Sequence, residues 1–457
     1  MSAATAHDRE RHRPRHGIRA RIGSPRPRDL WLAFAVCHLW LITLNLIGPT
    51  SALGDVTGIY RWWMQQGLGG GGWVGVDEPW VYPILAAVPM LIARLGGGEF
   101  YGTVWMLLVV AVDAAAFALL LRRCRGRSVR PAWWWLGFLV ALGPIGLGRI
   151  DAITVPLALA GLLLVVARPA LAAVLLTIGT WMKVWPAALL MAALASRRAT
   201  SRASHAIVAA TIGTSAVVVA GALALGSGGN VLGFVGQQTG RGLQVESSAA
   251  VYHLWRIVFG DDDYRVYHDT RLLAFQVSGP GVDAVAAALT PVMVAVVVGV
   301  LLLGVHAAHR GASAAALLGP LSLGLVTALI LTNKVGSPQY VSWIAVPVIV
   351  ILAHDRADSR LSVVVTRLAL VAAALTQLIY PYAYPLLLDA SPVLVAVITV
   401  RDLAELGLLA AAVVQLVALG RRRAADAVGS SDAVGRVRRD RPAVSDATGA
   451  IPVTAGP

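Results

Sequence analysis

Residues 30–63 read "LWLAFAVCHLWLITLNLIGPTSALGDVTGIYRWW", an apolar run followed by one acidic residue and a group of aromatic ones. The run itself, residues 30–48, has the length that crosses a hydrocarbon core of about 30 Å as an α-helix. A secretory signal has a shorter apolar region and a cleavage site with small residues. We therefore expect 30–48 to remain as a first transmembrane span, with Asp55 just beyond its end.

The composition of the chain extends this interpretation to the whole protein. Of the 457 residues, 57% are hydrophobic and 14% are charged, whereas soluble domains carry roughly 25% charged residues. Apolar runs of about 20 residues, the length of a membrane-spanning helix, recur along the sequence. A transmembrane β-barrel would show short alternating segments instead. The predicted fold class is an all-α polytopic membrane protein.

We expect about twelve transmembrane helices, several of them short. The apolar stretch 170–195 is divided at "WMKVWP", because Pro186 lacks a backbone donor and disfavours helix just before it. The expected spans are 30–48, 100–121, 131–148, 151–167, 170–182, 185–195, 205–225, 281–304, 312–331, 339–353, 361–380 and 393–419.

The segment 81–95, "VYPILAAVPMLIARL", decides on which side of the membrane every later loop lies. It is short and contains Pro83 and Pro89. Counted as a span, it would send the arginine-rich loop 122–130 outside, against the positive-inside rule. We therefore expect an interfacial or re-entrant helix here. Both termini and all arginine-rich loops then lie in the cytoplasm.

The predicted organisation is one transmembrane domain, residues 29–420, between two polar tails. Residues 1–28 and 421–457 are basic and lack apolar periodicity, so we expect both to be disordered on the cytoplasmic side. Large outer loops are expected at 49–99 and 226–280.

The net charge of +14 comes almost entirely from arginine in tails and short loops. Such a distribution favours topology signals over nucleic-acid binding, so no nucleic-acid partner is expected. Lys183 and Lys334 are the only lysines. Cys37 and Cys124 give no disulfide framework.

In this topology most of the unusual polar sequence falls on the non-cytoplasmic side. The cytoplasmic loops are plain by comparison, which is typical of an enzyme that works at one leaflet, here the outer face of the plasma membrane. The outer segments are "GDVTGIYRWW" (54–63), "GVDEPWVYP" (75–83), "GRID" (148–151), "MKVWP" (182–186), "GRGLQVESS" (240–248) and "TNKVGSPQY" (332–340).

These segments carry a resemblance to a known family. An acidic residue just after the first span, inside a large outer loop, resembles the GT-C glycosyltransferases, membrane enzymes that use polyprenyl-phosphate sugars. More narrowly, the chain resembles glycosyltransferase family 87 over roughly residues 30–420. The likeness rests on the order and shared sidedness of "GD…Y…W", "YP" (82–83), "GRID", "MKVWP", "RGLQVES" (241–247) and "NKVGSPQYVSW" (333–343).

The resemblance implies a GT-C-type fold with interfacial helices in the first outer loop. It also implies an inverting transfer of mannose from a polyprenyl-phosphate-mannose donor. The family includes actinobacterial mannosyltransferases that act on phosphatidylinositol mannosides, so the expected acceptor is a glycolipid or glycan and the expected product linkage is α. Membrane lipids are expected partners. No cofactor or metal is expected, since lysine and arginine alone can neutralise one lipid phosphate.

Two other functions remain open from the sequence. A transferase of arabinofuranose or another pentose from a similar donor would look almost the same. A lipid or sugar transporter is a different class, but transporters place polar residues near the midplane and often have two related halves. Here the polar motifs lie beyond helix ends on one face.

Asp55 is the candidate general base, because the acceptor hydroxyl must lose a proton as it attacks. It could instead cap a helix that starts near Thr57, and the two roles are compatible. Asp77 and Glu78 precede Pro79 and a short predicted helix. Helix-start chemistry is the first interpretation for them, and a role in binding sugar or acceptor, or as a second acid or metal ligand, is the other.

The candidate groups for the donor phosphate are Lys183, Arg241, Lys334 and His253. A cation near the membrane centre is expensive unless it is paired or lines a wet cavity. The alternative for the lysines is that their stems lie in lipid with the charged heads among headgroups.

The remaining candidates would bind sugar or acceptor through planar hydrogen-bonding groups and aromatic rings. Plainer alternatives are a polar loop for the "GRGLQVESS" residues, an aromatic belt for the tyrosines and a local ion pair within "GRID". Arg401 and Glu405, in the last span, can pair at i, i+4. The candidates are Tyr60, Tyr82, Arg149, Asp151, Gln244, Glu246 and Gln339.

Overall fold

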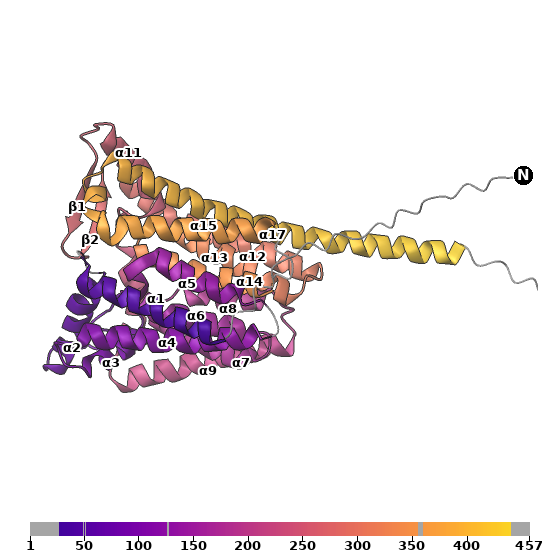
Figure 1. Ribbon diagram of the computed structural model, residues 1–457, viewed down its shortest axis with the longest axis horizontal. Coiled ribbons are helices and arrows are strands. Elements are labelled where there is room, and N and C mark those ends of the chain that lie inside the picture. The colour runs from indigo at the N-terminus through magenta and orange to yellow at the C-terminus, as the bar shows by residue number, and fades with distance from the viewer. Residues whose placement is uncertain (1–26, 49, 51, 126–127, 355–359, 440–457) are drawn as a thin grey trace, which may run out of the picture.

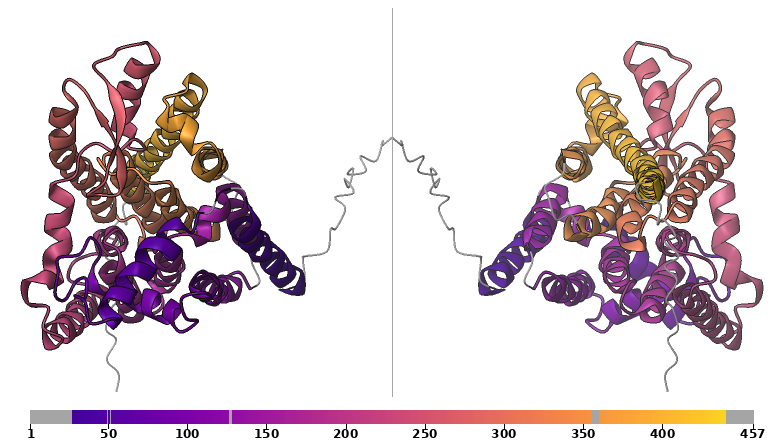
Figure 2. Two further views of the ribbon diagram at one scale, coloured as in Figure 1. Left: turned by 90° about the vertical axis from the view of Figure 1, so that its left-hand side faces the viewer. Right: turned by 90° about the vertical axis from the view of Figure 1, so that its right-hand side faces the viewer.

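The structure is a computed structural model that describes residues 27–48, 50, 52–125, 128–354 and 360–439. These residues form a bundle of helices that run along the long axis of the molecule (Figure 1). Seen along the bundle, the first helices of the chain occupy one side and the last helices the other (Figure 2). The prediction of an all-α polytopic membrane protein is confirmed.

Among the residues that the structure describes, seven helices are long and apolar enough to cross a membrane, and each falls on a predicted span. Helix α15 continues through a π-helical turn, η7 (Leu378–Tyr382). The seven are α1 (Pro27–Ile47), α4 (Tyr101–Arg123), α9 (Arg202–Ala224), α12 (Val282–His309), α13 (Ala314–Leu331), α15 (Arg360–Gln377) and α17 (Pro392–Arg439).

The other five predicted spans fall on shorter helices. A helix of 14 residues, such as α6 or α7, measures about 21 Å, less than the thickness of a hydrocarbon core. The five are α5 (Arg130–Leu142) with the 3₁₀ turn η3 (Gly143–Leu147), α6 (Asp151–Leu164), α7 (Pro169–Met182), α8 (Pro186–Ala195), and η6 (Pro338–Ile344) with α14 (Ala345–His354).

The predicted break at "WMKVWP" is present. Helix α7 ends at Met182 and α8 begins at Pro186, where a proline is tolerated in the first turn,. Lys183 between them is extended, with φ −155° and ψ 134°. Because Lys183 belongs to neither helix, its side chain can point in a direction that a helical residue there would not reach.

The loops that connect the predicted outer ends carry short elements, which gather at one end of the bundle on the left of Figure 1. The first outer loop has η1 (Asp55–Tyr60), α2 (Arg61–Leu68), η2 (Ile84–Ala86) and α3 (Ala87–Arg94). The second has η4 (Gly228–Leu232), α10 (Gly233–Thr239), η5 (Ser248–Ala250), α11 (Val251–Val258), β1 (Arg265–Asp269) and β2 (Ala274–Ser278), and α16 (Tyr384–Leu388) precedes α17.

The segment 81–95 returns to the side on which it starts. Just before η2, the Tyr82 hydroxyl lies 3.2 Å from that of Tyr60. After α3, the Gly98 carbonyl accepts a hydrogen bond from Arg61 at 3.3 Å. Because Tyr60 and Arg61 are neighbours in the chain, both ends of the segment lie at one place. This geometry is compatible with either predicted form, an interfacial or a re-entrant helix.

A β-hairpin in the second outer loop was not predicted. Strands β1 and β2 pair antiparallel, with Arg265 opposite Ser278 and Asp269 opposite Ala274. The preceding segment lies along the free edge of β2, where Val245 donates to the Phe275 carbonyl at 3.1 Å. The hairpin thus holds the "RGLQVES" segment.

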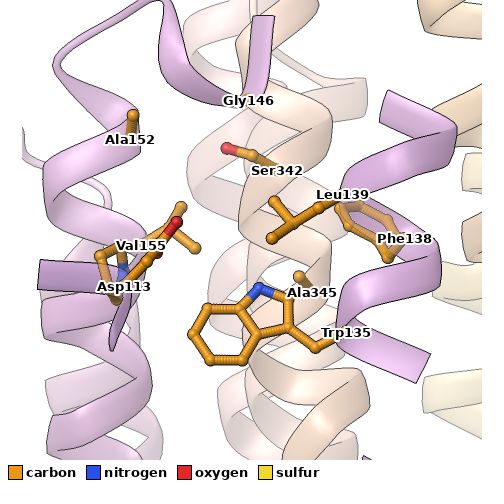
Figure 3. A pocket seen from close by; sticks show the side chains of 10 residues that line it. Asp113, Trp135, Phe138, Leu139, Gly146, Ala152, Val155, Ser342 and Ala345 are labelled. Carbon is orange, nitrogen blue, oxygen red and sulfur yellow. The ribbon is translucent and has the colours of Figure 1, made fainter. Parts of the chain in front are cut away.

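A buried hydrogen bond between a histidine and an aspartate joins the first two long helices halfway along their length. His38 Nε2 of α1 lies 3.0 Å from Asp113 Oδ2 of α4, and both side chains are almost fully buried. A cavity of about 10 Å³, room for about one water, adjoins Asp113 and the unpaired indole N–H of Trp135 (Figure 3). Its lining residues are Asp113, Trp135, Phe138, Leu139, Gly146, Ala152, Val155, Pro156, Ser342 and Ala345.

The predicted tails fall largely outside the described residues. This holds for 1–26 and for 440–457. Helix α17 continues past the last predicted span as far as Arg439 and projects beyond the bundle (Figure 1).

The sidedness can be tested with single cysteines, because the native Cys37 and Cys124 are buried. Asp262 lies exposed in the second outer loop, and Ser128 lies exposed between α4 and α5. We expect Asp262→Cys to react with a membrane-impermeant thiol reagent on intact cells. Ser128→Cys should react only after the cells are opened. The reverse labelling would invert the predicted topology.

Candidate active site

An ion pair joins three segments at the end of the bundle that carries the outer loops. Arg149, in the turn between η3 and α6, lies 3.1 Å from Asp55 Oδ1 through Nη1. Its other terminal nitrogen donates to the Tyr380 hydroxyl of η7 at 3.2 Å, and Nη1 also reaches the Ala52 carbonyl at 3.4 Å. The guanidinium is buried and the carboxylate is about one-third exposed. Asp55 therefore lies at the surface of the site with a fixed partner behind it.

A second ion pair lies beside the first. Lys183 Nζ donates to Asp151 Oδ2 at 2.7 Å, and the Trp343 indole N–H donates to Asp151 Oδ1 at 2.6 Å. Asp151 is 1% exposed, so both of its oxygens are satisfied inside the protein. The structure has two long-range ion pairs in place of the local pair considered for "GRID". Arg149 and Asp151 each bind a residue that is distant in the sequence.

The two ion pairs share one electrostatic environment. Burial lowers the pKa of the Lys183 ammonium, because a low dielectric disfavours its charge, and Asp151 opposes this effect,. The charge of Arg149 lowers that pKa further, while Asp55 raises it. Asp55 and Lys183, which are far apart in the sequence, therefore lie close enough to influence each other.

Aromatic side chains enclose the lysine. Its Nζ lies 4.9 Å from the ring centroid of Tyr340 and 5.8 Å from those of Tyr82 and Trp343. Trp343 stacks on Tyr340 and, on its other side, on Trp185. Such rings attract a cation through their negative faces.

Tyr60 and Tyr82 connect this enclosure to the Asp55 loop. Their hydroxyls lie 3.2 Å apart, and Tyr60 also accepts a hydrogen bond from the Ile150 amide at 3.4 Å. Burial and the charge of Asp55 raise the pKa of both phenols. Both tyrosines therefore stay protonated at neutral pH and can donate hydrogen bonds. They face the site and not lipid, unlike the residues of an aromatic belt.

The second half of the site comes from the two late motifs. The backbone amide of Gln244 donates to the backbone carbonyl of Lys334 at 3.0 Å, which places the "RGLQVES" and "NKVGSPQ" segments side by side. Gln339 is buried and accepts from the Ser337 hydroxyl at 2.8 Å. Arg241 is only partly buried, and its charge reaches the Tyr340 phenol of the lysine enclosure. The structure thus brings Arg241 and Lys334 to the same end of the bundle as Lys183.

Four predicted site residues have other surroundings. Asp77 and Glu78 are exposed, and Asp77 Oδ2 accepts from the Trp73 amide at 2.7 Å, which closes a local turn. Glu246 is buried against Arg401 of α17. His253 is buried in α11, stacked on Tyr264, and burial lowers its pKa. Asp77, Glu246 and His253 thus have local or buried partners away from the Asp55–Arg149 pair, and the roles predicted for these residues and for Glu78 stay predictions.

The sequence did not single out Trp343 and Tyr380. Trp343 belongs to the motif "NKVGSPQYVSW" and hydrogen-bonds the buried Asp151. Tyr380 begins the segment "YPYAYP" at the end of the predicted span 361–380, and its hydroxyl accepts a hydrogen bond from Arg149. The signal was a group of aromatic and proline residues at an outer helix end, the same pattern that had pointed to Tyr82.

Comparison with known families agrees with this geometry. Residues 80–332 match the sequence model of glycosyltransferase family 87. The match covers more than half of the chain, and the protein belongs to this family. It is therefore a membrane glycosyltransferase. Among curated proteins, none matches the chain.

The Lys183–Asp151 pair provides a test of the architecture of the site. Lys183→Met removes one partner and leaves a buried carboxylate unpaired, which should cost about 3 kcal/mol. We expect a lower midpoint of thermal unfolding in detergent. The double variant Lys183→Met/Asp151→Asn should regain much of this loss, because no charge remains buried.

The exposed Arg265→Met, on β1, serves as the control and should leave the midpoint unchanged. Equal midpoints for Lys183→Met and the wild-type protein would contradict the buried pair.

Proposed function

We propose that this glycosyltransferase moves mannose, with inversion, from a polyprenyl-phosphate-mannose donor to a glycolipid acceptor at the outer face of the plasma membrane. The acceptor resembles a phosphatidylinositol mannoside and the new linkage is α. One observation carries the proposal: the Asp55 carboxylate, about one-third exposed, is fixed by Arg149 beside the Lys183–Asp151 pair. We assign the site to the outer face because the arginine-rich loops, which mark the cytoplasmic side, lie at the opposite end of the bundle.

Asp55 is the group that takes the proton in this mechanism. The acceptor oxygen attacks the anomeric carbon, and the bond from that carbon to the phosphate oxygen breaks with its electron pair going to the phosphate. The hydroxyl proton passes to the Asp55 carboxylate. A direct displacement needs one base and no covalent intermediate, which fits one accessible acid.

Arg241 and Lys334 are the groups that meet the donor phosphate in this mechanism. The backbone amide of Gln244 donates to the Lys334 carbonyl, so the segments that carry Arg241 and Lys334 lie side by side. The negative charge that develops on the leaving phosphate needs cations or hydrogen-bond donors. Arg241 and Lys334 supply them from the second half of the site, and Lys183 adds to the local field.

The sugar would lie against tyrosine hydroxyls and aromatic faces. Tyr60 and Tyr82 keep their protons and donate, and Gln339 offers an amide. The two rings that stack beside Lys183, Tyr340 and Trp343, provide a flat apolar surface. These groups would accept a hexose or a pentose, and mannose is favoured by the family resemblance.

Substitution of Asp55 tests the base. Asp55→Asn should lower the rate of transfer by about 10²- to 10⁴-fold, the usual contribution of a general base. Expression and donor binding should be retained, since the amide has the shape of the carboxylate. The measurement is formation of labelled glycolipid in membranes.

Asp262→Asn, in an exposed turn of the second outer loop, is the matched control and should leave the rate unchanged. Unchanged products in the Asp55→Asn membranes would rule out Asp55 as the base.

The donor is tested directly with labelled lipids. Membranes that contain the protein should transfer label from polyprenyl-phosphate mannose to a phosphatidylinositol-type glycolipid, and membranes with Asp55→Asn should not. Label transfer from the arabinofuranosyl donor alone would replace mannose by a pentose. Movement of label across the membrane without a new glycosidic bond would make the protein a transporter.

A further inference from the structure

Arg401 lies near the start of the last helix and contacts a loop of the second half of the site. It belongs to α17 and is 4% exposed. Its Nη1 lies 3.2 Å from the Glu246 carboxylate, and its Nη2 donates to the Glu246 backbone carbonyl at 3.1 Å. One guanidinium thus holds both the side chain and the main chain of a single loop residue, which requires the flat, forked shape of arginine.

Two further carboxylates, from the same helix, lie beside the Arg401 guanidinium. Asp402 Oδ1 lies 2.9 Å from it, and Glu405 Oε1 lies 3.9 Å from its Nε. All three carboxylates around Arg401 are less than a tenth exposed. A lone cation in such a place would be expensive to bury, but here it is surrounded by acceptors. Arg401 is therefore a fixed point of the helix and not a mobile surface side chain.

The held loop also carries two candidate site residues. Arg241 and Gln244 precede Glu246 in the segment "RGLQVES". Two hydrogen bonds join the loop to the "NKVGSPQ" segment. The Ser247 hydroxyl donates to the Asn333 carbonyl at 2.7 Å, and the Gln244 backbone amide donates to the Lys334 backbone carbonyl. The "RGLQVES" loop therefore lies between Arg401 and the "NKVGSPQ" segment.

Gly336 permits the close approach of that segment. A Cβ at this position would lie 2.0 Å from the Glu246 carbonyl carbon and 2.1 Å from the Ser247 nitrogen. Such distances are far inside van der Waals contact, so any side chain here would push the loop away. The "RGLQVES" loop therefore contacts the backbone at Gly336 on one side and the Arg401 side chain on the other.

We propose that Arg401 is a positioning residue for the transfer reaction. It fixes the "RGLQVES" loop through Glu246 and thereby sets where Arg241 and Gln244 meet the donor. This inference rests on the proposed function for its kinetic consequence. Its structural consequence, a loop held by Arg401, stands independently of the reaction.

The first test measures access to the loop. Gln244→Cys introduces a thiol at a position that is 7% exposed, while the native cysteines are buried. Arg401→Lys keeps the buried positive charge but cannot hold the carboxylate and the carbonyl together. We expect the thiol to react with an impermeant reagent about tenfold faster or more in the Arg401→Lys protein, the change that the loss of one charge-assisted hydrogen bond brings.

A second variant moves the same loop without touching the arginine. Gly336→Ala should also speed the reaction of Gln244→Cys, because its methyl group displaces the loop. Arg367→Lys, at an exposed position of α15, is the matched control and should leave the thiol protected. Protection in both the Arg401→Lys and the Gly336→Ala proteins would overturn the proposal.

The kinetic test separates positioning from direct chemistry. Arg401→Lys should raise the donor KM by about tenfold and leave kcat within about twofold, since the base is untouched. Combined with Arg241→Gln, it should add little further loss, because both changes remove the same contact. Fully additive effects, or a fall in kcat alone, would overturn the proposal. Absence of transfer by the wild-type protein would instead defeat the proposed function and leave the access test decisive.

Discussion

The pairing of Asp55 with Arg149 is the contact on which the arrangement of the site depends. In a chain this apolar, an unpaired buried guanidinium would be too expensive to keep. The pair brings η1 and the turn before α6 together, and Arg149 also hydrogen-bonds the π-helical turn after α15. Asp151 and Lys183 add the break between α7 and α8 in the same way. Four segments distant in the sequence are thus joined by directional polar contacts as well as by apolar packing.

The sequence predicted the helices well, because apolar length is a local property. It also predicted the break at Lys183, which Pro186 marks, and an interfacial or re-entrant segment before α4, which two prolines and the following arginine-rich loop indicate. The pairing of Arg401 with Glu405 at i, i+4 was predicted, and the two lie 3.9 Å apart, but the long-range partners of the charges could not be predicted. Arg149 and Asp151 are two residues apart, so a local pair was as reasonable as the long-range pairs that form. The partner of Glu246 is Arg401, more than 150 positions away, and no pattern in the chain links the two. The β-hairpin was missed because its strands are short and weakly alternating.

The site divides into an early and a late half, and the halves have different kinds of support. The early half, with Asp55, is held by ion pairs and by tyrosines that face inward. The late half, with Arg241 and Lys334, consists of backbone segments laid against β2 and one buried arginine. The proposed base thus lies in the half that is held by ion pairs, and the cations proposed for the phosphate lie on segments that are held by backbone hydrogen bonds and Arg401. A general base must keep its distance from the reacting oxygen, and a buried ion pair helps to fix that distance.

The helix α3 turns back at the surface from which it came, and this has a consequence for how the protein is made. Each crossing of a bilayer moves the chain to the other side of the membrane. One added or lost crossing therefore reverses the sidedness of every loop that follows. In the predicted topology, two prolines and a shortage of apolar length in one stretch therefore orient the rest of the polypeptide during insertion. A few substitutions that lengthened α3 into a full crossing would present the late half of the site to the wrong compartment, with every later helix still intact.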